Sequence, residues 1–138
     1  MPEQLNWLYP WMHLVGRVLL ALVFVLNGVF HIAKLRDMGA YAGSKGVPMA
    51  NVAVAFSGLM IFVGGVLIGL GWHRFIGAWL IVLFLIPVTI WMHNFWKQTD
   101  PAARMVDMQH FLKNIALLGA ALLVAYYAGG YWPMSLGG

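Results

Sequence analysis

Four long runs of apolar residues constrain this chain more than any other feature of its sequence. They extend over residues 12–33, 52–71, 75–92 and 111–129. Each is close to the roughly 20 apolar residues that a helix needs to cross a bilayer. Backbone in lipid must satisfy its own hydrogen bonds, so each run is expected to be a helix rather than an open strand. The sequence therefore predicts an all-α fold, an antiparallel bundle of four transmembrane helices with both termini on the same side.

The composition agrees with a membrane protein and excludes several other classes. Hydrophobic residues make up 62% of the chain and charged residues 9%, whereas soluble domains have about 45–50% and about 25%. The net charge of +4 comes from scattered residues, not from a basic stripe, so the expected partner is the lipid bilayer and not nucleic acid. Cysteine is absent, which excludes disulfides, thiolate metal sites and cysteine-ligated iron–sulfur clusters.

Basic residues are distributed unevenly between the two ends of the predicted bundle. The end that contains the two longer connections, called the loop side below, has Lys34, Arg36, Lys45, Lys97, Arg104 and Lys113. The opposite end, called the terminus side, has only Arg17 and Arg74. The positive-inside rule therefore predicts cytoplasmic loops and external termini. Arg17, slightly inside the first run, is expected to snorkel to the outer surface.

Two connections have recognisable features of their own. Residues 34–51 are rich in glycine and are expected to form a loop. Asp100-Pro101 is a helix-start signal with proline at the first helical position, so a short interfacial helix is expected over residues 101–108. In the second run, small residues recur at four-residue spacing and predict close helix packing. They are Ala53, Ser57, Gly65 and Gly69.

Polar residues within the apolar runs are the candidate functional residues, and several occur near the loop side. Asn27 and His31 are four residues apart and share a helix face. His93 ends the third run and His110 begins the fourth, at a similar expected depth. We therefore expect a polar, cofactor-binding site near the cytoplasmic face. Its candidate residues are His31, His93, His110, Asn27, Asn94, Asn114 and Trp96.

The alternative is structural. Histidine is tolerated at the level of the lipid headgroups, where water solvates it, and asparagine often forms hydrogen bonds between helices. No residue is assigned a catalytic or metal-binding role from the sequence.

The sequence resembles the DoxX family of small four-helix membrane proteins. The resemblance rests on GRVLLALVFVLNGVFHIAKL at residues 16–35, MHNFW at 92–96 and QHFLKNIALLGAALL at 109–123. It implies that residues 1–138 form a single DoxX-like transmembrane domain of a bacterial or archaeal-type cytoplasmic (inner) membrane. It also implies a link to the quinone-coupled sulfur oxidation and terminal oxidase chemistry of founding relatives. The residues that match the family pattern are Arg17, Gly28, Lys34, His93, Phe95, Trp96, His110, Phe111 and Asn114.

Three functions follow, in decreasing order of support. The first is a small quinone-linked subunit of a membrane redox complex, in which histidine and asparagine side chains would bind the ring carbonyls and exchange protons. The chain has no flavin, nicotinamide or iron–sulfur motif, so another membrane or peripheral subunit would supply the electrons. The second is a non-enzymatic accessory or assembly subunit of a membrane complex. The third is a histidine-ligated haem or metal protein, ranked lower because no dense carboxylate set accompanies the histidines.

Overall fold

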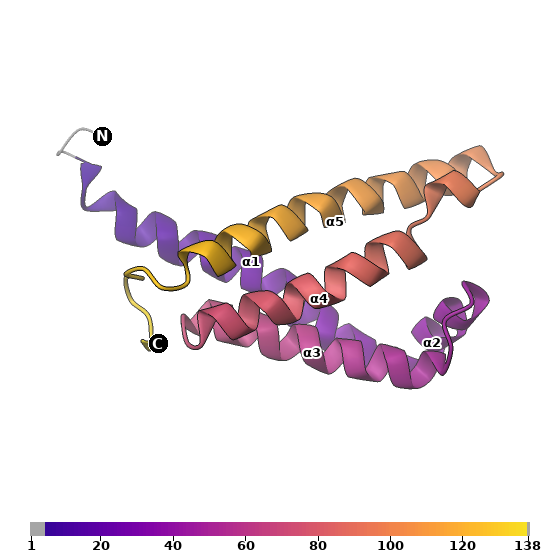
Figure 1. Cartoon of the computed structure of the whole chain (residues 1–138), viewed down its shortest axis with the longest axis horizontal. Helices are drawn as coiled ribbons and strands as arrows, with labels where there is room; N and C mark the ends of the chain where they lie inside the picture. The colour runs from indigo at the N-terminus through magenta and orange to yellow at the C-terminus, as the bar shows by residue number, and fades with distance from the viewer. Residues whose placement is uncertain (1–4, 138) are drawn as a thin grey trace.

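The computed structural model describes residues 5–137, and over that range all regular elements are helices (Figure 1). In chain order they are α1 (Leu8–Ala33), α2 (Leu35–Ser44), α3 (Ala50–Leu70), α4 (Arg74–Met92), the 3₁₀ turn η2 (Phe95–Lys97) and α5 (Pro101–Tyr127). The helices α1, α3, α4 with η2, and α5 are long and apolar enough to cross a membrane. The predicted all-α, four-transmembrane-helix class is therefore confirmed.

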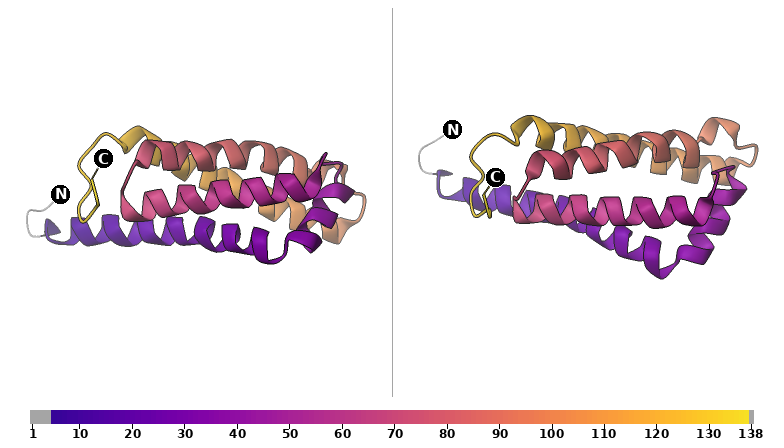
Figure 2. Two further views of the ribbon diagram at one scale, coloured as in Figure 1. Left: turned by 90° about the horizontal axis from the view of Figure 1, so that it is seen from below. Right: turned by 60° about the horizontal axis from the view of Figure 1, so that its bottom comes forward.

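The four long helices contact one another in chain order. α1 packs against α3, α3 against α4, and α4 against α5. Figure 2 shows α3 and α4 side by side as a hairpin, with both termini at the same end of the bundle. Large apolar side chains are exposed along all four helices, as a surface in contact with lipid tails requires.

The centre of the bundle is built from aliphatic residues and one phenylalanine, contributed by all four long helices. Its buried members are Phe24, Ile61, Ile68, Ala78, Ile81, Val82, Leu85 and Ala121. Lipid tails are as apolar as these side chains, so helix association depends on close van der Waals contact rather than on the removal of apolar surface from water.

Glycine residues allow the closest approach between α1 and α3. A Cβ atom added at Gly58 would lie 2.4 Å from the Cβ of His31, and one added at Gly28 would lie 2.7 Å from the carbonyl oxygen of Gly58. Farther along α3, Gly65 and Gly69 contact Ala21 of α1. The predicted small-residue packing is therefore confirmed at these two glycines, while the tightest contact is one residue away from the expected Ser57.

Gly58→Ala is expected to destabilise the bundle by about 1–3 kcal/mol, because the new methyl group must push α1 away from α3. Gly119→Ala is the matched control, since no atom lies within 4 Å of a Cβ there. Alanine is the better helix former, so the control is expected to gain up to about 1 kcal/mol. Reversible unfolding in mixed detergent micelles measures both changes. Equal effects of the two substitutions would contradict the proposed packing.

The residues between α1 and α3 differ from the expected loop, because they contain α2. A Cβ atom added at Gly39 of α2 would overlap the side-chain oxygen of Asn51, so this glycine lets α2 lie directly on the start of α3. Gly39 and Ala42 are buried there. Tertiary packing therefore stabilises a short helix that glycine-rich local sequence disfavours.

The interfacial helix expected over residues 101–108 is not a separate element but the beginning of α5. The side chain of Asp100 accepts a hydrogen bond from the Ala103 amide at 2.8 Å, and Pro101 occupies the first turn. The start signal was therefore interpreted correctly, and the helix that it begins continues to Tyr127.

Candidate functional site

A cluster of polar side chains at the loop side is centred on Asp107 of α5. The Lys45 Nζ atom lies 3.1 Å from Asp107 Oδ2, and the Gln98 side-chain amide donates to the same oxygen at 2.6 Å. The His93 Nδ1 atom lies 3.5 Å from Asp107 Oδ1. Asp107 is only 5% exposed, and a buried carboxylate needs a counter-ion and donors of this kind. The cluster thus ties the end of α2 to the end of α4 and the start of α5.

Two histidines lie beside this carboxylate. The rings of His93 and His110 are stacked, with centroids 5.0 Å apart and planes inclined by 24°. His93 is partly buried and His110 is exposed, and Lys113 Nζ lies 3.4 Å from His110 Nδ1. The stacked pair therefore extends from the buried carboxylate to the protein surface.

Aromatic residues and a groove flank the cluster on the lipid-facing side of α4. Phe95, Trp96 and Phe111 meet edge to face, with ring centroids 5.3–5.8 Å apart. The Trp91 indole N–H donates to the Lys45 carbonyl at 3.0 Å. A mostly apolar groove of about 320 Å³ is lined by Pro87, Ile90, Trp91, Asn94, Trp96 and Lys97.

The structure distributes the predicted site residues over three places. His93 and His110 are in contact, and Asn114 lies one turn deeper on α5 than His110. Asn94 and Trp96 line the groove.

His31 and Asn27 lie apart from both groups. The His31 ring is 8% exposed, donates through Nδ1 to the Asn27 carbonyl at 2.7 Å, and meets the edge of Phe84 at 5.9 Å. The Asn27 amide donates to the Val23 carbonyl of its own helix. Among residues 5–137, no ring contact or hydrogen bond joins either residue to His93.

Asp107, Lys45 and Gln98 are the site residues that the predicted set lacks. The available signal was a carboxylate three residues before His110, on the same helix face, because a buried Asp107 must find a cation and further donors. The identity of those partners depends on how the connections after α2 and α4 fold onto α5. Local sequence alone therefore does not predict them. Within the described range, no group of three or more His, Asp or Glu residues is arranged to hold a metal ion.

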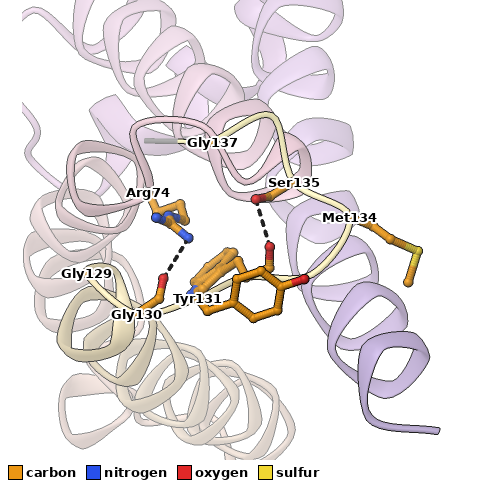
Figure 3. A pocket seen from close by; sticks show the side chains of 8 residues that line it. Arg74, Gly129, Gly130, Tyr131, Met134, Ser135 and Gly137 are labelled. Atoms are coloured by element: carbon orange, nitrogen blue, oxygen red, sulfur yellow. Dashed lines mark hydrogen bonds between the residues drawn. The ribbon is translucent and has the colours of Figure 1, made fainter. Parts of the chain in front are cut away.

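The C-terminal segment closes the terminus side of the bundle. Trp132 lies between two buried arginines, with the guanidinium carbon of Arg17 5.9 Å and that of Arg74 5.0 Å from its ring centroid. Arg74 donates to the Gly130 carbonyl at 3.1 Å (Figure 3). A pocket of about 480 Å³ is lined by Arg74 and residues of the 129–137 segment.

The expectation that Arg17 snorkels to the outer surface is wrong. Its side chain is 5% exposed and donates to the carbonyls of Pro133, at 2.7 Å, and Met134. The C-terminal segment folds back over the bundle and supplies these acceptors, so the guanidinium group binds protein rather than water.

Comparison with known proteins gives one match. A family model described as DoxX matches residues 12–94, more than half of the chain. No curated protein and no solved structure matches significantly. The matched range begins within α1, extends through α4 and ends at Asn94, next to the stacked histidine pair.

Proposed function

This chain belongs to the DoxX family and is a multi-pass membrane protein, and we propose that it is a small quinone-linked subunit of a membrane redox complex. In this proposal the loop side faces the cytoplasm, as the basic residues predict. One observation supports the function best. An apolar groove with polar groups lies next to the Asp107, His93 and His110 cluster, at the same end of the bundle.

The groove has the chemical character that a quinone ring requires. Pro87 and Ile90 form an apolar wall, Trp91 and Trp96 offer aromatic rings, and Asn94 offers an amide donor for a ring carbonyl. Its volume of about 320 Å³ is near the lower limit of common ligand pockets, roughly 300–1,000 Å³. The groove thus suits a single ring whose apolar tail extends into lipid.

The residues of the chain would bind, orient and exchange protons, while a bound quinone would supply a two-electron, two-proton couple. Asn94 and the Lys97 ammonium group would hold ring carbonyls by hydrogen bonds. Asn94 directly follows His93, so the groove is adjacent to the histidine pair. His110, exposed to solvent, would exchange protons with water, and His93 would exchange them with its stacked neighbour.

Asn94→Leu tests this assignment, with binding measured as quenching of tryptophan fluorescence by a short-chain quinone in lipid nanodiscs. The loss of one amide hydrogen bond is expected to weaken binding about tenfold, which corresponds to about 1.4 kcal/mol. Asn6→Leu, the same exchange at an exposed position on the terminus side, is the matched control and is expected to bind like the unaltered protein. Unsaturable quenching, or equal binding by both variants, would refute the quinone site.

The second candidate is an accessory or assembly subunit, and the packing of α5 favours it. Only 11% of the most apolar part of α5 is buried, against 33% for α3, so α5 offers a long face to a partner helix. Pull-down from native membranes separates the two functions. A partner with a flavin or an iron–sulfur centre supports the redox subunit, and a partner without a redox cofactor supports the accessory subunit.

A further inference from the structure

Two buried polar side chains on α4 and α5 have no hydrogen-bond partner among the described residues. Thr89 is 2% exposed, and its hydroxyl makes no hydrogen bond. Asn114 is 7% exposed, and its amide is in no hydrogen bond of residues 5–137. A threonine in a helix usually donates to the carbonyl four residues earlier, but the Thr89 hydroxyl does not do so.

These side chains lie at the same level of the bundle. His93 is opposite His110 at the loop side, and Arg74 is opposite Gly130 at the terminus side. The interval from 74 to 93 is 19 residues and that from 110 to 130 is 20, so α4 and α5 keep one antiparallel register. Four residues from the histidine pair, the register places Thr89 of α4 opposite Asn114 of α5, one helical turn deeper in the bilayer.

The next polar side chain toward the loop side is His93. Its Nδ1 atom lies 3.5 Å from Asp107 Oδ1, and the residue directly follows α4, four positions after Thr89. An unpaired hydroxyl or amide in the membrane interior is costly. Ordered water satisfies such groups when two to four polar partners surround it. The Thr89 hydroxyl and the Asn114 amide provide both donors and acceptors for one water molecule.

We propose that Thr89 and Asn114 bind a buried water molecule between α4 and α5, beneath the His93–His110 pair. The water extends the hydrogen-bonded network of the loop side by one helical turn into the bilayer. The site ends there, because Leu85 of the apolar core, 1% exposed, and Leu118, which packs against that core, fill the next level. This proposal involves no quinone and is independent of the proposed function.

Water-edited solid-state NMR of the isotope-labelled protein in lipid bilayers tests the site directly. Magnetisation is expected to pass from water to the Thr89 Cβ–H group and to the Asn114 side-chain amide. Leu85 and Ala121 are expected to remain without signal. The absence of magnetisation transfer from water to both Thr89 and Asn114 would overturn the proposal. This result is expected if the two side chains form a hydrogen bond with each other directly.

Thr89→Val removes the hydroxyl at nearly constant volume. The direction in which the unfolding midpoint changes then distinguishes a water-bound hydroxyl from an unpaired one. Loss of the water and its hydrogen bonds is expected to remove the water signal at Asn114 and to lower the unfolding midpoint by about 3 °C. If the hydroxyl were truly unpaired, its removal would raise the midpoint, which would overturn the proposal. Ser57→Ala is the control. The Ser57 hydroxyl donates to the Val54 carbonyl of its own helix at 3.1 Å, so its loss is expected to leave the water signal unchanged.

Discussion

Replacement of Arg17 by methionine is expected to lower the free energy of unfolding by about 3 kcal/mol, because the guanidinium group joins α1 to the C-terminal segment. Arg17 donates to the carbonyls of Pro133 and Met134 and lies against the Trp132 ring. Methionine fills a similar volume but leaves both carbonyls without this donor. Arg17→Lys keeps the charge but not the forked geometry, so an intermediate loss is expected.

Unfolding in mixed detergent micelles measures the loss, and thiol labelling locates it. The chain has no cysteine, so Ser135→Cys introduces a single thiol into the C-terminal segment. In the Arg17→Met background this thiol is expected to react faster with a maleimide, because the segment is released from the bundle. Arg36→Met, at an exposed position of α2, is the control. Unchanged stability and unchanged labelling in Arg17→Met would show that the C-terminal segment is held by other contacts.

Asp107→Leu is expected to destabilise the protein by about 3 kcal/mol, because it leaves the Lys45 ammonium group without its counter-ion. The Lys45 side chain is only 14% exposed, and Gln98 loses its acceptor at the same time. Asp107→Asn keeps a neutral acceptor for Gln98 and is expected to cost less. The same unfolding measurement in detergent micelles gives each value.

A double substitution distinguishes a pair interaction from a general effect of Asp107. Lys45→Met combined with Asp107→Leu is expected to recover most of the lost stability, because no buried charge then lacks a partner. Asp37→Asn, an exposed acid of α2, is the control and is expected to change stability little. Losses that simply add in the double variant would contradict the pairing of Lys45 with Asp107.

The local sequence determined the class of fold and the approximate extent of α1, α3 and α4. Hydrophobicity and length act within each run, so the four membrane-crossing helices could be predicted without knowledge of their neighbours. The Asp100-Pro101 start of α5 was predictable for the same reason, since the cap is made by residues three positions apart. The small residues of α3 indicated close packing, but not which of them touches α1.

The candidate site was predictable only in part. The depth of His93 and His110 followed from their places at the ends of two runs, and their contact agrees with it. The depth of His31 suggested that it belongs with them, yet its side chain lies against Gly58 of α3 and Phe84 of α4. Depth follows from position in a span, whereas contact depends also on the rotation of each helix about its axis.

The sequence by itself thus determined that this protein crosses the membrane four times and that its polar residues gather near one end. Only the tertiary structure decided which of them meet: Lys45 with Asp107, and Arg17 with the C-terminal carbonyls. The physical reason is that hydropathy is a property of each segment alone. Helix rotation and register are set by contacts between segments that lie far apart in the chain. The contact between Gly28 of α1 and Gly58 of α3 is one of them.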